Sequence, residues 1–347
     1  MLPMFVAVTG SSGDPRFAVT AFSIVGRAST KLMRPPFESD PVGCVVACSG
    51  MLAAVGAYQQ TTVWIYDISN PANPTLQIAL DSTLGAPNGI GTLSLDGTNL
   101  LIGQWDGPSV VLLDTTTGGV LASGAVEDFS GGITALALKG KTAIVSGQDN
   151  FDVLNYDSSA GTLTPSPYVG DIDFSGPVTC DFDGSTAVVG YTDGFGLSHL
   201  HAFNIVNGAL EGEIMPALAA PGGVTSVTVS GTQVAAAAIG ELSVALLSLN
   251  SPNGGFVNVD NSDGPAGGVP KIYGGSNLAV ANNNGVMYLW SGVSAWPSPA
   301  LFGSATGFGL STDGFTTVGF TEVEQFRPLP IPPWMRPLLE RIFAKRG

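Results

Sequence analysis

Basic residues are scarce in this chain. Its 347 residues include 12 lysines and arginines against 27 aspartates and glutamates, which gives a net charge of −15. Between Arg34 and Lys271 the sequence contains two basic residues, Lys139 and Lys141. A surface that binds nucleic acid needs clustered positive charge to neutralise phosphates. We therefore expect no nucleic-acid partner for the body of this protein.

Cysteine is rare as well, with three residues at Cys44, Cys48 and Cys180. Cys44 and Cys48 belong to one expected strand, where their spacing is too long for a disulfide. All three cysteines occupy strand positions that carry leucine or valine in other parts of the chain. We expect buried free thiols that pack as small apolar side chains, and no disulfide framework.

Targeting and membrane segments are missing from the sequence. No basic region precedes the apolar run at residues 4–8, which fits a strand better than a signal peptide. The apolar stretch at residues 224–249 is interrupted by Gln233, Glu241 and regularly placed small residues. The sequence therefore predicts neither a signal peptide nor a transmembrane span.

Common catalytic motifs are missing too. There is no phosphate-binding glycine loop, no G-x-S-x-G motif, and no cysteine paired with a plausible histidine base. The two histidines, His199 and His201, share one face of an expected strand and could bind a metal with a third ligand. Other repeats carry apolar or aromatic residues at those places. No catalytic residue, metal site or cofactor is therefore expected.

Two acidic stretches have some likeness to calcium-binding loops. Residues 260–264 read DNSDG, but no glutamate follows at the position where an EF-hand has its bidentate ligand. Residues 181–184 read DFDG and fit the turn of a repeat. We interpret both stretches as turns.

Glycine, by contrast, is abundant and marks a repeat. Seven times a short apolar strand pattern ends in a small-residue pair closed by glycine, and a second apolar strand pattern follows. These glycines are separated by 39 to 47 residues, a period typical of a β-propeller with one blade per repeat. The sequence predicts an all-β fold, with a seven-bladed β-propeller over residues 1–326. The frame glycines are Gly50, Gly97, Gly140, Gly184, Gly231, Gly275 and Gly314.

The strands after each frame glycine follow a common pattern. The second strand is rich in small residues, which fits a place near a propeller's central channel. A polar turn leads to a third strand, and that strand ends in a short polar residue that suits the turn into a fourth strand. We predict a structural role for these residues. They are Asp67, Asp114, Asp157, Asn204, Ser248 and Ser291.

Both ends of the chain are predicted to close the ring in one composite blade. Such closure removes the free edges that an open sheet would expose. Residues 5–37 supply strands without a preceding first strand, and the last repeat starts at about Gly307 and supplies two strands. This count exceeds four strands by one. We therefore expect either residues 5–9 or residues 315–321 to lie outside the regular pattern.

Residues 327–347 form a distinct segment. They carry a net charge of +4, whereas the rest of the chain carries −19. A proline-rich linker precedes an amphipathic helix predicted from Trp334 to Lys345, with Pro337 tolerated in its first turn. The residues predicted to bind a partner are Trp334, Met335, Leu338, Leu339, Ile342, Phe343, Arg336 and Arg341.

Three roles remain open for this helix. It could cap the acidic body of the same chain, because its own charge is positive. It could also dock in a groove of a protein partner, or rest on a membrane surface. A membrane role is the least favoured, because the apolar stripe is short and lacks a second anchoring signal. We take docking to a protein partner as the leading interpretation.

Parts of the sequence resemble known propeller families. Residues 64–75, WIYDISNPANPT, resemble the strand and turn of LVIVP-type repeats. The Trp-Asp and Gly-His dipeptides of WD40 repeats are missing at the expected places of the repeat, so the likeness to WD40 proteins concerns architecture. The stretches from Phe5 (FVAVTGSSGDPRFAVTAFSIV) and from Gly43 (GCVVACSGMLAAVGAYQQTTVWIYDIS) are similar to propellers among tailed-phage structural proteins. This resemblance implies decoration of tails or virions, with a role in assembly or host contact.

The expected function is therefore a non-enzymatic interaction module. It would be a virion or phage-tail component that acts in assembly or host-surface recognition, with a virion or cytoplasmic location. Two alternatives stay open. One is a lactonase-like hydrolase with a metal at the channel mouth. The other is a glycan binder that uses exposed tryptophans and asparagine-rich turns such as Asn282 to Asn284.

Overall fold

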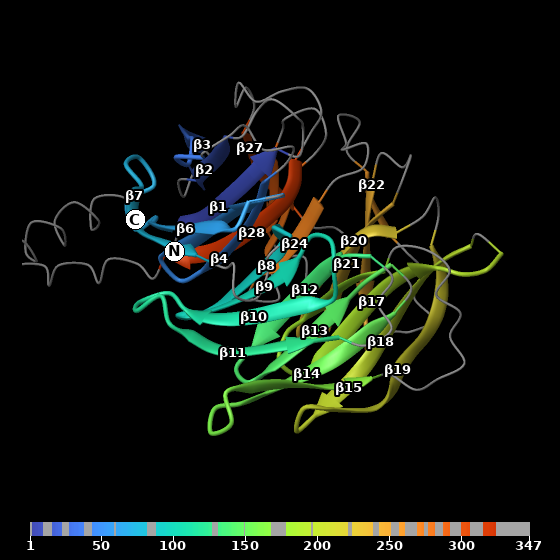
Figure 1. Ribbon diagram of the computed structural model, residues 1–347. Coiled ribbons are helices and arrows are strands. Elements are labelled where there is room, and N and C mark those ends of the chain that lie inside the picture. Colours follow the sequence, from blue (N-terminus) through green and yellow to red (C-terminus); the bar gives the residue numbers. More distant parts are fainter. Residues whose placement is uncertain are drawn as a thin grey trace, which may run out of the picture.

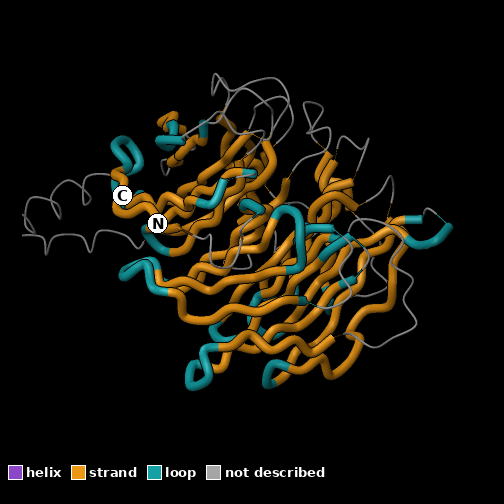
Figure 2. The backbone as a smooth tube through the Cα atoms, viewed as in Figure 1, coloured by secondary structure: helices purple, strands orange, loops and turns teal. Residues whose placement is uncertain are grey.

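The computed structural model describes most of the body of the chain. The described residues are 2–9, 16–22, 28–37, 44–58, 60–81, 88–126, 131–148, 150–167, 178–195, 197–220, 224–238, 243–250, 257–260, 269–273, 277–281, 287–291, 300–305 and 315–323. Within these ranges the chain forms 28 strands and no helix (Figures 1 and 2). The predicted all-β fold is confirmed. None of the described elements is a helix capable of crossing a membrane.

The strands pair in antiparallel groups of four, each built from consecutive strands. The first two groups are β4 (Cys44–Ser49), β5 (Leu52–Ala57), β6 (Thr62–Asp67) and β7 (Thr75–Asp81), then β8 (Ile90–Asp96), β9 (Asn99–Gln104), β10 (Ser109–Asp114) and β11 (Val120–Ala125). The next two are β12 (Ala135–Lys139), β13 (Thr142–Ser146), β14 (Phe151–Asp157) and β15 (Thr162–Pro167), then β16 (Thr179–Phe182), β17 (Thr186–Thr192), β18 (Ser198–Val206) and β19 (Ala209–Ala220). Two more are β20 (Val224–Ser230), β21 (Gln233–Ala238), β22 (Ser243–Ser248) and β23 (Val257–Asp260), then β24 (Val269–Tyr273), β25 (Asn277–Ala281), β26 (Met287–Ser291) and β27 (Ala300–Ala305).

Two of these groups are joined at their outer edges. β11 and β15 pair in parallel at one position, Ser123 opposite Thr162. The pairing merges the groups β8–β11 and β12–β15 into one eight-stranded sheet.

Both chain ends contribute to a further four-stranded sheet, in the order β28-β1-β2-β3. Its strands are β28 (Phe315–Val323), β1 (Leu2–Thr9), β2 (Phe17–Phe22) and β3 (Ala28–Met33). β1 runs antiparallel to β28, with Val6 opposite Gly319 (Figure 1). The expectation that residues 5–9 or 315–321 lie outside the pattern was therefore wrong. In this sheet β28 has the position that the first strand has in the other groups. The glycine repeat had predicted a second strand there.

The first strands of the sheets contact one another in a closed cycle. The cycle runs β28, β4, β8, β12, β16, β20, β24 and back to β28. Apolar side chains fill the space between successive sheets, so each inner strand is buried on both faces. In β9, for example, Ile102 belongs to the core shared with β4–β7, and Leu101 belongs to the core shared with β12–β15.

The small residues of the second strands allow neighbouring sheets to approach closely. A Cβ atom on Gly103 of β9 would lie 2.7 Å from the Cγ2 atom of Ile133 in the next sheet. At Gly190 of β17 it would lie 2.4 Å from the Cγ1 atom of Val224. From the sequence we interpreted these small residues as a sign that the second strands lie near the central channel. In the structure they make room for the next sheet, and the first strands form the inner cycle.

The glycine frame marks the turns between the first and second strands. Gly50, Gly97, Gly140 and Gly231 have φ angles of 57°, 60°, 61° and 59°. Each is the first residue of a two-residue hairpin loop whose second residue has negative φ, as in a type II′ turn. Glycine adopts this conformation without a steric penalty, which explains its recurrence. Gly275 and Gly314 lie outside the described residues.

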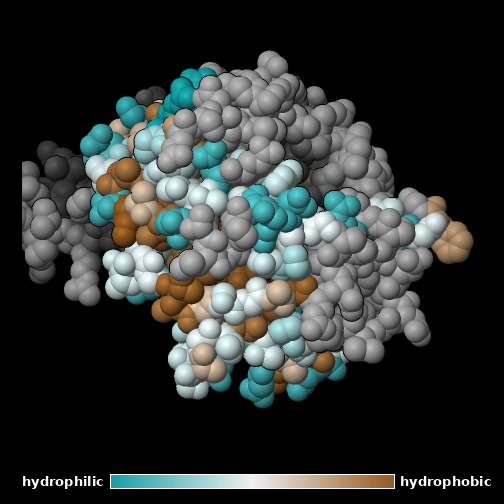
Figure 3. All heavy atoms as spheres, in the orientation of Figure 1, coloured by the Kyte–Doolittle hydropathy of each residue, from teal (hydrophilic) through white to brown (hydrophobic). Residues whose placement is uncertain are grey.

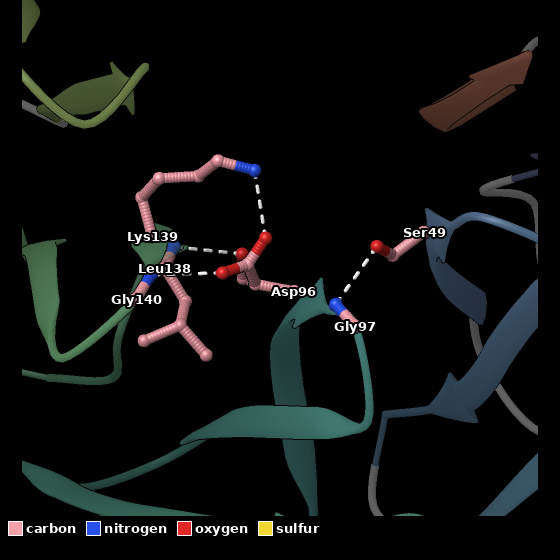
Figure 4. Close-up of polar contacts among 7 residues, drawn as sticks. Ser49, Asp96, Gly97, Leu138, Lys139 and Gly140 are labelled. Atoms are coloured by element: carbon pink, nitrogen blue, oxygen red, sulfur yellow. Dashed lines mark hydrogen bonds and ion pairs between the residues drawn. The ribbon is translucent and has the colours of Figure 1, made fainter.

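Hydrogen bonds also link frame turns of neighbouring groups of strands at three described junctions. The carboxylate of Asp96, just before Gly97, accepts a hydrogen bond from the backbone N–H of Gly140 in the next group of strands (2.8 Å). It also forms an ion pair with Lys139 Nζ (2.7 Å; Figure 4). The N–H of Gly97 itself donates to Ser49 Oγ in the preceding sheet (2.9 Å). Because hydrogen bonds are directional, these contacts set the height of one sheet against its neighbour.

Most of the structural roles predicted for polar residues and cysteines are confirmed where the structure describes them. The carboxylates of Asp67, Asp114 and Asp157 accept hydrogen bonds from backbone N–H groups two residues later. None of the three cysteines forms a disulfide; Cys44 and Cys180 are buried in the cores between sheets, and Cys48 is partly buried against one of them.

Candidate functional site

The two ends of the strands form two faces of the ring. The described frame turns, at Gly50, Gly97, Gly140, Gly184 and Gly231, lie on one face, because the first strand of each of these groups runs toward its frame glycine. Each second strand runs the other way, so the turns between second and third strands lie on the opposite face. We call this second face the pocket face. On it lie Tyr58 after β5, Trp105 after β9, Gln148 after β13 and Asp193 after β17.

A cavity of about 420 Å³ opens on the pocket face. It draws on three successive groups of strands, β4–β7, β8–β11 and β12–β15. Its volume is within the range of small-ligand sites in proteins. The residues that line it include Tyr58, Trp105, Asp106, Gly132, Thr134 and Gln148.

An aromatic pair forms one wall of this cavity. The rings of Tyr58 and Trp105 lie with centroids 4.1 Å apart at an interplanar angle of 31°. Tyr58 is partly buried, whereas Trp105 is 42% exposed. One face of the indole is therefore covered by a neighbouring ring, and much of the remaining surface is open to solvent. An exposed tryptophan beside a cavity is typical of a binding surface.

Hydrogen bonds fix the backbone around Trp105 on both sides. The backbone N–H of Trp105 donates to the carbonyl of Gly89 (2.9 Å), and the backbone N–H of Ile133 donates to the carbonyl of Gln104 (3.0 Å). A Cβ atom on Gly132 would lie 1.7 Å from the carbonyl oxygen of Trp105, so a larger residue does not fit there. The side-chain amide of Asn88 donates to the carbonyl of Asp106 (2.7 Å). The indole thus projects from a rigid segment.

Several polar groups at the cavity are free to bind a ligand. Within the described part of the chain, the carboxylate of Asp106, the amide of Gln148 and the hydroxyl of Tyr58 make no hydrogen bond. Burial, with a smaller contribution from the nearby Cys44, raises the pKa of Tyr58 above its ordinary value. Its hydroxyl is therefore neutral at physiological pH and can donate a hydrogen bond.

A second feature of the pocket face is the turn between β17 and β18. Asp193 accepts hydrogen bonds from the N–H groups of Phe195 (2.9 Å) and Leu197 (2.8 Å). It also contacts His199 Nε2 at 2.7 Å. The hydrogen bond from His199, supported by the two backbone N–H groups, lowers the pKa of Asp193 below its ordinary value. One carboxylate thus organises the whole turn.

This turn exposes large apolar side chains. Phe195 is 90% exposed and Leu197 is 56% exposed. With Trp105, they account for three of the five large hydrophobic residues that are exposed among the described residues. In the space-filling view, apolar atoms gather in patches between polar ones rather than spreading evenly (Figure 3). Exposed aromatic side chains such as Phe195 are candidates for contact with other molecules.

The histidines lie on one face of β18, as predicted. Tyr191 stacks against His199 with ring centroids 5.3 Å apart, and His201 is buried beside Phe203. In the described part of the chain, no group of three histidine, cysteine, aspartate or glutamate residues could hold a metal ion. His199 instead contacts Asp193 of its own sheet.

The acidic stretch at residues 181–184 forms a frame turn, as predicted, and also links two sheets. Asp181 accepts hydrogen bonds from Val229 N–H (3.0 Å) and Thr228 Oγ1 (2.8 Å), and Asp183 accepts one from Gly231 N–H (2.7 Å). The second acidic stretch, residues 260–264, lies outside the described residues after Asp260.

The predicted partner-binding residues in 327–347 and the asparagine-rich turn at 282–284 lie outside the described residues. Sequence reasoning did not identify the cavity. The polar turn between second and third strands was recognised only as a turn, and in two of the groups this turn contains Asp106 or Gln148. A usable signal was the aromatic residue that ends two small-residue strands, Tyr58 in GAY and Trp105 in GQW.

Comparison with known proteins identifies the fold. No protein-family model matches this sequence, and no curated protein does. A solved hypothetical selenium-binding protein from Sulfolobus tokodaii matches with a TM-score of 0.62 and 13% identity, over 92% of this chain and 93% of that one. A chain of the mitotic checkpoint complex matches with a TM-score of 0.58 and 16% identity, over 82% and 86%. The WD40 repeats of RRP9 match with a TM-score of 0.57 and 11% identity, over 76% of this chain and 81% of that one. The chain thus has a WD40-like β-propeller fold.

We predict that acid releases the turn at Asp193. Because the folded-state pKa of this carboxylate is lowered, its hydrogen bonds stabilise the turn above the ordinary aspartate pKa of about 3.9 and are lost as pH falls through the lowered value. The amide-proton shifts of Phe195 and Leu197, followed by NMR, should change together below that pH. In an Asp193→Asn variant they should not titrate there. Amide shifts that titrate at or above the ordinary aspartate pKa, or that titrate in the same way in the Asp193→Asn variant, would contradict this assignment.

Proposed function

We propose that this chain is a seven-bladed β-propeller that acts as a non-enzymatic interaction module and binds a protein partner on its pocket face. Each of the seven groups of four strands is one blade in this proposal. The closed cycle of first strands and the sheet shared by the two chain ends support the blade count.

The observation that carries the binding proposal is the exposure of aromatic side chains on one face. Phe195 and Trp105 project from turns of two different sheets, and both turns are held by hydrogen bonds. Rigid, exposed aromatic residues lose little conformational entropy on binding and often contribute most of the affinity of an interface. The described turns thus have the features of a preorganised binding surface.

The tail supplies a second part of the proposal. Residues 327–347 combine positive charge with an apolar stripe, which suits docking to a protein partner as an amphipathic helix. We propose that this segment attaches the propeller to a larger assembly. The proposed setting, a virion or phage tail with a role in assembly or host recognition, is based on the sequence resemblance described above.

A substitution on the pocket face tests the binding proposal. Phe195→Ser should weaken capture of partners by the tagged protein from its native source at least about tenfold, because an exposed aromatic anchor is lost. Leu76→Ser is the matched control, since Leu76 is 45% exposed on the outer strand β7 and away from the pocket face. Quantitative mass spectrometry of the captured proteins measures both. Equal capture by the two variants would rule out this face as the binding surface.

Deletion of residues 327–347 tests the tail. We expect the truncated protein to keep its circular-dichroism spectrum and melting temperature, because the described sheets close without that segment. It should no longer enter its complex, as measured by native mass or by co-sedimentation. Normal incorporation of the truncated protein would show that the tail is not the attachment segment.

A further inference from the structure

The cavity at Trp105 combines an aromatic wall with negative charge. The indole of Trp105 is covered on one side by Tyr58 and is 42% exposed. Asp106 follows it directly, and its carboxylate makes no hydrogen bond within the described part of the chain. Among the described residues that line the cavity, Asp106 is the one that carries a charge. A free carboxylate next to an open aromatic face is a favourable arrangement for a cation.

The charge of the whole chain favours the same kind of ligand. Its net charge is −15, and between Arg34 and Lys271 its basic residues are Lys139 and Lys141. Both lysines belong to the frame turn that contains Gly140, on the face opposite the cavity. A field of this sign attracts cationic ligands to the cavity and repels anionic ones.

Arginine fits these groups better than other cations do. Its planar guanidinium can stack on the open indole face while its N–H groups donate to a carboxylate and to other acceptors. The carboxylate of Asp106 and the amide oxygen of Gln148 are such acceptors. A volume of about 420 Å³ also leaves room for the neighbouring residues of a peptide.

We propose that this cavity binds an arginine side chain presented by a basic segment of the protein partner. Trp105 stacks on the guanidinium, Asp106 pairs with its charge, and Gln148 accepts a further hydrogen bond. This inference depends on the proposed recognition function and adds to it the chemistry of the partner.

Titration of the full chain with two peptides tests the proposal. The probes are acetyl-Gly-Gly-Arg-Gly-Gly-amide and the same peptide with citrulline, which keeps the shape of arginine and removes the charge. The reporter is the indole N–H resonance of Trp105, assigned with a Trp105→Phe variant. The arginine peptide should shift this resonance with saturation and should bind about tenfold more tightly than the citrulline peptide. Added salt should weaken the binding.

Charge-matched variants separate a local contact from a general field. Asp106→Asn should weaken binding of the arginine peptide about tenfold. Asp67→Asn removes the same charge from a turn at the end of β6, on the face of the frame turns, and should leave the affinity nearly unchanged. Melting curves of both variants verify that they fold. Equal binding of the two peptides, or equal effects of the two substitutions, would overturn the proposal.

Two further outcomes have clear meanings. If N-acetylglucosamine shifts the Trp105 resonance and the arginine peptide does not, the cavity is a glycan site and the arginine proposal is wrong. If the arginine peptide fails to bind while Phe195→Ser still abolishes partner capture, this inference falls and the proposed function stands. Failure of both experiments would overturn both proposals.

Discussion

Hydrogen bonds between frame turns fix the register of neighbouring sheets at three described junctions of this ring. At each junction a side chain of one frame turn accepts a hydrogen bond from the backbone N–H of a frame glycine in the next group of strands. The pairs are Ser49 and Gly97, Asp96 and Gly140, and Asp183 and Gly231. Apolar packing between the sheets contributes more free energy, but it has no direction and allows sheets to slide. The directional bonds, together with backbone bonds such as Ile133 N–H to the carbonyl of Gln104 on the pocket face, remove that freedom.

The candidate site depends on this register. Tyr58, Trp105 and Gln148 belong to three different groups of strands and meet at one cavity. A shift of one sheet along its neighbour by a single residue, about 3.3 Å, would separate the rings of Tyr58 and Trp105. In the proposed function the ring is a scaffold, and side chains on its turns supply the binding chemistry. This arrangement suits recognition of a partner, because the aromatic groups are positioned before contact.

Sequence reasoning succeeded where a structural requirement is local. The frame glycines are visible because a type II′ turn needs positive φ at one residue, and the turn aspartates bond to their own neighbours. Sequence reasoning failed where the two residues in contact are far apart in the sequence. The ring closure involves Val6 and Gly319, and the glycine period marks turns without saying which strand is innermost. The pairing of Asp96 with Gly140 and the stacking of Tyr58 on Trp105 are likewise set by neighbouring sheets, so composition and spacing could not reveal them.

The role of the bonds between frame turns is tested most directly by comparing the urea unfolding of the variants Asp96→Ala and Asp67→Ala. Asp96 accepts hydrogen bonds from the next sheet, whereas Asp67 accepts one from Ser69 in its own turn. If contacts between frame turns hold the sheets together, Asp96→Ala should lower the free energy of unfolding by about 2 kcal/mol, because it removes a hydrogen bond to a charged group and an ion pair with the neighbouring frame turn at once. Asp67→Ala should cost less than half as much. Equal losses, or no loss for Asp96→Ala, would contradict the claim that these bonds set the ring.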